Sequence, residues 1–165
     1  MSLYNRRSFL IAGAALFLGS ACNFSPVYAP GSASSKLADR IAIKDPKTKD
    51  EYNIVRHLES RLGRADPAPM TLSFSVSKGS AGLGTTATGS TTRIQQVGTL
   101  NYSLKNASSG ATIASGSVRN FTGYSATSNT AATLASERAA SERLMIILAD
   151  QLIDRLHAID PELLP

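Results

Sequence analysis

The chain of 165 residues has a formal charge of +5 at pH 7, no tryptophan and a single cysteine. Its lysines and arginines are scattered, so the mild basic excess argues against a nucleic-acid-binding protein, and no nucleic-acid partner is expected. One cysteine excludes an internal disulfide framework. The length after removal of a leader suits one domain whose stability comes from aliphatic packing.

The N-terminal residues follow the pattern of a bacterial export signal that ends at the cysteine. Arg6 and Arg7 form the charged part, residues 9–18 are apolar, and the small residues 19–21 directly precede Cys22. The apolar run is shorter than the roughly 20 residues that span a bilayer. We therefore expect residues 1–21 to be removed as a lipoprotein signal peptide and Cys22 to carry lipid.

Two alternatives remain at this leader. An ordinary secretory signal would leave Cys22 as an unmodified thiol, and Gly19 stands where a lipobox usually has leucine. The Arg6-Arg7 pair fits a twin-arginine signal about as well as a general secretory one.

The residues after the cysteine predict a lipid-anchored tether and then one folded domain. Residues 22–35 are rich in serine, alanine, proline and glycine, so we expect a tether there and a single α+β domain over residues 36–165. Alternation over residues 37–43 predicts a first strand. A helix follows, opened either by Asp45-Pro46 or by a capping box of Thr48 with Glu51, and Gly63 ends it.

The middle of the chain predicts an antiparallel meander of three strands. Apolar and polar residues alternate over residues 70–77, and strand character returns over 94–104 and 111–121. The segment Gly79–Thr92 is rich in glycine, serine and threonine, so we expect a mobile loop between the first two of these strands. A tight turn is expected over residues 106–110.

The last element is a long helix over about residues 127–158. Leu134, Met145, Leu148, Leu152, Leu156 and Ile159 approximate one apolar stripe. Residues 144–149 are apolar on every side, so we expect both the sheet and the first helix to cover them, with a partner protein as the alternative. The predicted fold is thus α+β, with two helices on one four-stranded, mainly antiparallel sheet in the order β-α-β-β-β-α.

No catalytic, metal or cofactor site is indicated. His57 and His157 lie on polar helix flanks without a second ligand at metal-site spacing, so we expect both to be solvated. No Gly-x-Ser-x-Gly elbow surrounds a serine. The glycines of residues 79–84 precede neither a Walker lysine nor a helix, so they do not form a phosphate loop.

Several short segments together carry a family resemblance. They are the opening Cys22-Asn23-Phe24-Ser25-Pro26-Val27-Tyr28, then Arg56, Leu58, Leu62, Arg93, Tyr102, Leu104, Tyr124-Ser125-Ala126, Arg138, residues 148–153 and Leu156. In this order, and behind a lipoprotein leader, they resemble the LptE family of outer-membrane lipopolysaccharide-assembly lipoproteins over most of the mature chain.

The resemblance implies a function in lipopolysaccharide assembly without catalysis. It implies a lipid-anchored protein on the periplasmic side of the outer membrane, acting as plug and partner of an LptD-like β-barrel translocon that inserts lipopolysaccharide. An auxiliary lipoprotein of a lipid-transport ABC system is the first alternative. A twin-arginine-exported periplasmic enzyme is the second.

Four basic residues lie on or beside the predicted meander. Lys78, Arg93, Lys105 and Arg119 are candidate contacts to acidic groups of the barrel or to phosphates of lipopolysaccharide. Solvation is the alternative role of each, because an isolated exposed charge contributes little.

Overall fold

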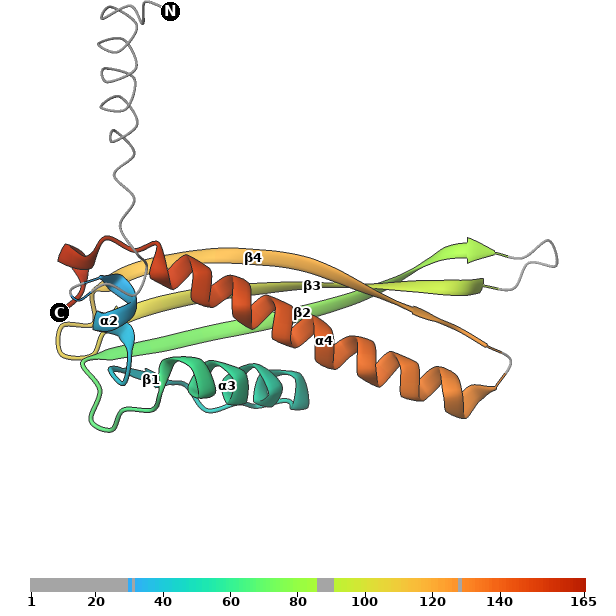
Figure 1. Ribbon diagram of the computed structural model, residues 1–165, viewed down its shortest axis with the longest axis horizontal. Helices are drawn as coiled ribbons and strands as arrows, with labels where there is room; N and C mark the ends of the chain where they lie inside the picture. Colours follow the sequence, from blue (N-terminus) through green and yellow to red (C-terminus); the bar gives the residue numbers. More distant parts are fainter. Residues whose placement is uncertain (1–29, 31, 86–90, 128) are drawn as a thin grey trace, which may run out of the picture.

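The computed structural model describes residues 30, 32–85, 91–127 and 129–165 (Figure 1). The elements in chain order are α2 (Ala33–Leu37), β1 (Ile41–Ile43), α3 (Lys49–Leu62), β2 (Met70–Thr85), β3 (Thr91–Asn106), β4 (Thr112–Ser125), α4 (Thr130–His157) and the 3-10 helix η2 (Pro161–Leu163). The long strands and α4 make the domain elongated.

The strands form one four-stranded sheet in the order β1-β2-β3-β4. β1 lies parallel to β2, with Ile41 opposite Met70, whereas β2, β3 and β4 form an antiparallel meander. The parallel pair follows from α3, which connects β1 to β2 as a crossover. The predicted α+β fold and the predicted order of strands and long helices are therefore confirmed, with a mixed sheet and one additional short helix.

The segment before β1 differs from the prediction. Residues expected to belong to the tether and to the first strand instead form α2, whose Leu37 is fully buried in the core. Lys36 Nζ donates a hydrogen bond of 2.6 Å to the backbone carbonyl of Pro161. Residues 33–37 thus belong to the folded domain, and the first strand is only three residues long.

Local signals set both ends of α3. Thr48 Oγ1 accepts a hydrogen bond of 3.2 Å from the backbone N–H of Glu51, so the capping box sets the start of this helix. Gly63 has a φ of 78°, a left-handed value that glycine adopts without strain. The apolar face of α3 points into the core, and its members are buried: Ile54, Val55, Leu58 and Leu62.

The prediction of a loop over Gly79–Thr92 is largely wrong. β2 continues to Thr85 and β3 begins at Thr91, with Gly79 opposite Val97 and Gly82 opposite Ile94. Register shifts between Gly82 and Thr85 accommodate the end of the ladder. Cross-strand pairing with larger side chains outweighs the low strand propensity of glycine. Residues 86–90 lie outside the described residues, so their predicted mobility stays a prediction.

α4 packs closely against the sheet over a glycine of β3. A β-carbon on Gly98 would lie 2.8 Å from Leu148 Cδ1 and 3.2 Å from Leu144 Cδ2. These leucines are fully buried, together with Leu100 of the adjoining sheet. The absence of a side chain at Gly98 therefore lets the helix approach the strand backbone.

The apolar segment of α4 is covered mainly as expected, by the sheet and by α3. Leu144, Met145, Leu148 and Ala149 are buried, whereas Ile146 is 39% exposed. Leu134, predicted to belong to the stripe, is 43% exposed, so that part of the prediction is wrong. The physical reason is visible in Figure 1, where the first turns of α4 extend past the N-terminal end of α3.

None of the helices in the described part of the chain combines the length and the apolar character needed to span a bilayer.

Changing Gly98 to Ala is expected to lower the free energy of unfolding by about 1–3 kcal/mol, because the added methyl group overpacks the contact with Leu144 and Leu148. Gly79→Ala is the matched control, since no atom lies within 4 Å of a β-carbon built there. Urea unfolding of both variants measures the difference. Equal midpoints would contradict this account of the helix contact.

Candidate functional site

The structure separates the four predicted basic residues into two groups. Lys78 Nζ reaches Ser141 of α4, so Lys78 lies on the face of the sheet that the helices cover. Side chains alternate along each strand. The other three residues alternate with Lys78 and with the residues paired to it across the sheet. The other face therefore carries Arg93, Lys105 and Arg119.

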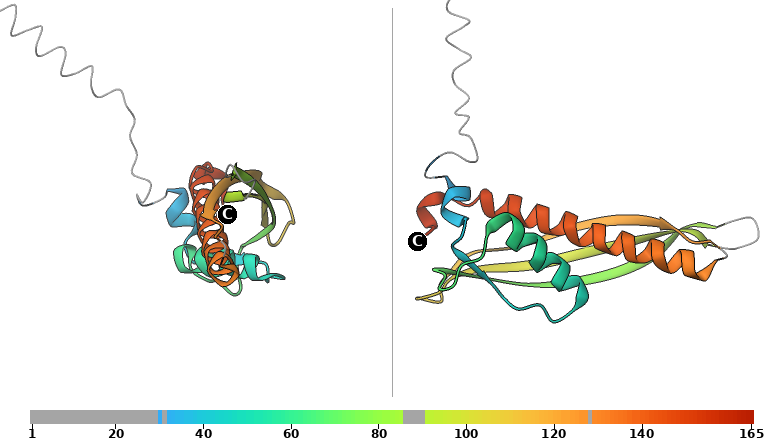
Figure 2. Two further views of the ribbon diagram at one scale, coloured as in Figure 1. Left: turned by 90° about the vertical axis from the view of Figure 1, so that its right-hand side faces the viewer. Right: turned by 60° about the horizontal axis from the view of Figure 1, so that its bottom comes forward.

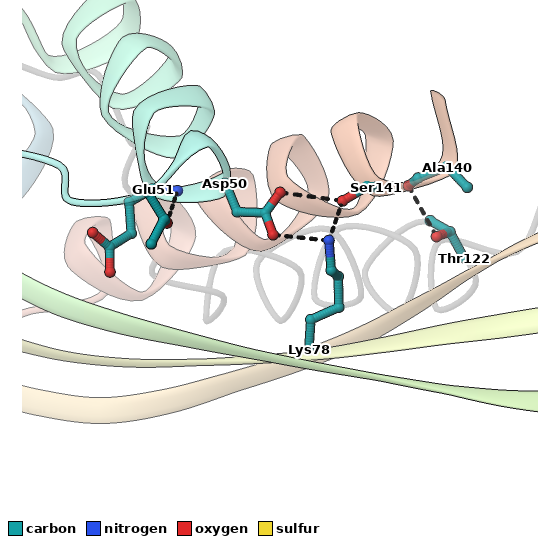
Figure 3. A network of polar contacts seen from close by, with 7 residues as sticks. Asp50, Glu51, Lys78, Thr122, Ala140 and Ser141 are labelled. Carbon is teal, nitrogen blue, oxygen red and sulfur yellow. Dashed lines mark hydrogen bonds and ion pairs between the residues drawn. The ribbon is translucent and has the colours of Figure 1, made fainter. Parts of the chain in front are cut away.

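Lys78 belongs to a polar cluster that joins three elements (Figure 3). Its Nζ lies 2.8 Å from Asp50 Oδ2 of α3 and donates a hydrogen bond of 2.7 Å to Ser141 Oγ of α4. Ser141 Oγ in turn donates to Asp50 Oδ1 at 3.2 Å. The three side chains thus satisfy one another at the junction of α3, β2 and α4.

Each member stands where its own element favours it. Asp50 is in the first turn of α3, where a carboxylate interacts favourably with the positive end of the helix dipole. Lys78 occupies the inward position that follows the apolar series of β2, and its flexible stem reaches across the layer. Ser141 is buried but small, so it leaves room for both charged groups.

A groove of about 300 Å³ adjoins the cluster. Its lining is Lys49, Asp50, Asn53, Lys78, Leu134, Glu137, Arg138, Ser141 and Glu142. Three basic and three acidic residues line it, so the groove has no single charge preference. Ser141 Oγ donates its hydrogen bond to the carboxylate of Asp50, which is itself paired with Lys78. The arrangement serves to join α3, β2 and α4.

The prediction that both histidines are solvated is wrong, because each is partly buried. His57 Nε2 lies 2.7 Å from Asp150 Oδ1, and this pair links α3 to α4. Burial lowers the pKa of His157, and Arg61 adds to this effect while Asp154 opposes it. Tyr124 has a raised pKa because of burial and the nearby carboxylate of Glu137. His57 thus joins α3 to α4, and His157 borders a small groove that residues of α2, α3 and α4 line.

Cys22, the predicted lipidation site, lies outside the described residues. Among the residues that are described, no group of three His, Cys, Asp or Glu side chains is arranged to hold a metal ion.

The fold and this site define an α+β domain whose polar cluster is a structural junction. The model of the lipopolysaccharide-assembly family LptE matches residues 36–156. The chain belongs to this family. The predicted resemblance is therefore confirmed over most of the folded domain. No match was found among the curated protein sequences.

Solved structures of bacterial lipoproteins share this fold. A protein from Caulobacter crescentus CB15, described as a lipoprotein, is 19% identical with a TM-score of 0.63, covering 76% of this chain and 92% of that one. Lipoprotein B from Nitrosomonas europaea is 14% identical with a TM-score of 0.60, covering 81% and 92%. Rare lipoprotein B from Shewanella oneidensis is 15% identical with a TM-score of 0.50, covering 71% and 91%.

Sequence reasoning placed Lys78 beside the meander but missed its partners. The available signal was the phase of β2, because a lysine at an inward-facing position needs a partner across the layer. The pairing of His57 with Asp150 joins residues far apart in the chain and left no such signal.

The ion pair of Asp50 and Lys78 is expected to couple α3 to β2. Lys78→Met and Asp50→Asn should each lower the free energy of unfolding by about 1 kcal/mol, and the double variant should lose less than the sum. Lys105→Met, on the uncovered face, is the control and should change stability by less than about 0.5 kcal/mol. Urea unfolding at low and high salt gives the coupling, and strict additivity would contradict it.

His157 is expected to make stability depend on pH. Because folding lowers its pKa below the unfolded value of 6.5, the unfolded state binds more protons in that window. The contribution of neutral His157 is fully present above pH 6.5 and is lost as the pH falls through the folded pKa. His157→Gln should therefore lose less stability between pH 7.5 and 5.5 than the wild type. Urea midpoints at both pH values decide this, and equal losses would refute it.

Proposed function

We propose that this protein is a lipoprotein of the outer membrane, anchored through Cys22 on the periplasmic side. In this proposal it assists the assembly and insertion of lipopolysaccharide as plug and partner of an LptD-like β-barrel translocon, and it performs no chemical step. The observation that carries the proposal is the family match over residues 36–156. The leader that ends at Cys22 supports the anchor.

The shape of the domain supports a plug. Each of β2 and β3 contains 16 residues, which corresponds to about 50 Å of extended chain and is comparable to the thickness of a membrane with its headgroups. Figure 1 shows α2 and the C-terminus at one end of this long axis, and the distal ends of β2 and β3 at the other. An anchor that precedes α2 would therefore hold the domain by one end.

Lipidation is tested on the mature N-terminus. We expect mass spectrometry to find a chain that begins at Cys22 and carries acyl groups, because Cys22 directly follows the small residues of the leader. Cys22→Ser should abolish processing of the leader or, in a detergent phase partition, move the protein from the detergent phase to the aqueous phase. An unmodified Cys22 thiol in the wild type would refute the anchor.

The partner is tested by affinity purification of the tagged full-length protein from detergent-extracted envelopes. We expect one outer-membrane β-barrel protein to be recovered in about equal amount, and lipopolysaccharide to be recovered with the complex. Recovery of an inner-membrane ABC transporter without a barrel would replace this proposal by the auxiliary-lipoprotein alternative.

A further inference from the structure

One face of the meander is uncovered in the described part of the chain. The helices gather on one side of the sheet, as the end-on view in Figure 2 shows. Lys78, Gly98 and Thr122 contact α4, so their alternation phase faces the helices. We call the opposite phase the open face. It consists of the odd-numbered residues 71–81 of β2, 93–105 of β3 and 115–125 of β4.

The open face carries positive charge only. Its charged members are Arg93, Lys105 and Arg119, and none of them forms an ion pair with another described residue. Arg119 lies on the edge strand β4 and also borders a groove that Asp154 and Arg155 of α4 line. From Pro67 to Ser136 the sequence contains no aspartate or glutamate, so all twelve acidic residues of the chain lie outside the meander. The face is therefore complementary to a surface that bears carboxylates or phosphates.

The three cations are evenly spaced along the sheet. Arg119 pairs with Thr99, which lies six residues from Arg93 and six residues from Lys105 on β3. At about 3.3 Å per residue, neighbouring cations are about 20 Å apart. Two of them cannot close on one phosphate group, because such recognition requires donors that converge within hydrogen-bond distance. The spacing instead fits a partner that extends along the whole sheet.

Small side chains surround the cations. One row across the three strands is Ser73, Ser103 and Ser115, and the next is Ser75, Asn101 and Ser117. Hydroxyl and amide groups of this size allow close approach of another polar surface and supply hydrogen bonds to it. A flat polar sheet meets these requirements.

Phe121 interrupts this polar surface. It is 60% exposed and shares a row with Gly79 and Val97, so its ring stands beside two smaller residues. Exposed aromatic residues surrounded by small or polar neighbours are typical anchors of protein interfaces. Phe121 is thus the residue of the open face with the largest apolar area available to a partner.

We propose that the open face docks flat against a polar, carboxylate-bearing sheet of a partner protein, with Phe121 as its apolar anchor. Since the interior of a transmembrane β-barrel is polar, the inner wall of the barrel is the source of that sheet. This inference rests on the proposed function and assigns it a surface. A second copy of the chain is disfavoured, because a symmetric pair of open faces would bring like charges together.

Two substitutions and two matched controls test the surface in the tagged full-length protein. Combined Arg93→Glu, Lys105→Glu and Arg119→Glu should reduce recovery of the barrel about tenfold. Reversal of three exposed cations outside the open face, Lys44 and Lys47 between β1 and α3 and Arg143 on α4, should not. Phe121→Ala should reduce recovery similarly, whereas Tyr52→Ala, at 56% exposure on α3, should not. Unchanged urea midpoints exclude a loss of folding.

Site-specific photo-crosslinking identifies the occupant. A photoreactive residue at positions 75, 101 or 117 should form adducts with the barrel protein. Adducts of these positions with lipopolysaccharide alone or with a second copy of the chain would overturn the inference. Adducts of the barrel with positions 52 or 143, and none with the open face, would also overturn the inference. In that case the proposed function stands. If the wild-type protein recovers no barrel at all, the proposed function fails and the inference fails with it.

Discussion

The packing of α4 against one face of the meander is the constraint on which the structure depends. Leu144 and Leu148 pack over Gly98, and this close approach sets the distance between the two layers. α3 then packs against the adjoining side of the apolar segment of α4 and leaves Ile146 partly exposed. Lys78 joins α3 to the sheet and to α4 through Asp50 and Ser141. Because both long helices pack on the same face of the sheet, no described residues cover the other face.

Alternation and capping predicted most of the fold. The strand that begins at Met70 and the helix capped by Thr48 follow from local patterns that tertiary packing reinforces. The failures share a cause. Gly79 to Thr85 has the composition of a loop, and only pairing with β3 makes it a strand. α2 likewise exists because Leu37 enters a core that α4 completes, which a local pattern does not show.

The candidate site was predictable in composition but not in geometry. The four basic residues are evident in the sequence, and alternation alone separates Lys78 from neighbours of opposite phase on β2. Alternation along β3 puts Arg93 and Lys105 on one face, but assigning Arg119 to the same face requires the register of β4 against β3. A one-residue slip would have turned Arg119 toward α4. Register is a long-range property, so the line of cations became visible only in the assembled sheet.

The absence of acids from the meander is not a requirement of folding. Strand propensity accounts for the absence of aspartate, but glutamate is depleted in strands to about the same degree as lysine, so it does not explain why the face carries cations and no glutamate. Exposed charges about 20 Å apart interact weakly through water, so the three cations neither stabilise nor destabilise the sheet appreciably. A solvated face would therefore tolerate acids at many of its serine and threonine positions. The absence of acids from the open face has a physical consequence only where another surface approaches it. A carboxylate on the open face would then be desolvated and repelled by a carboxylate of the partner.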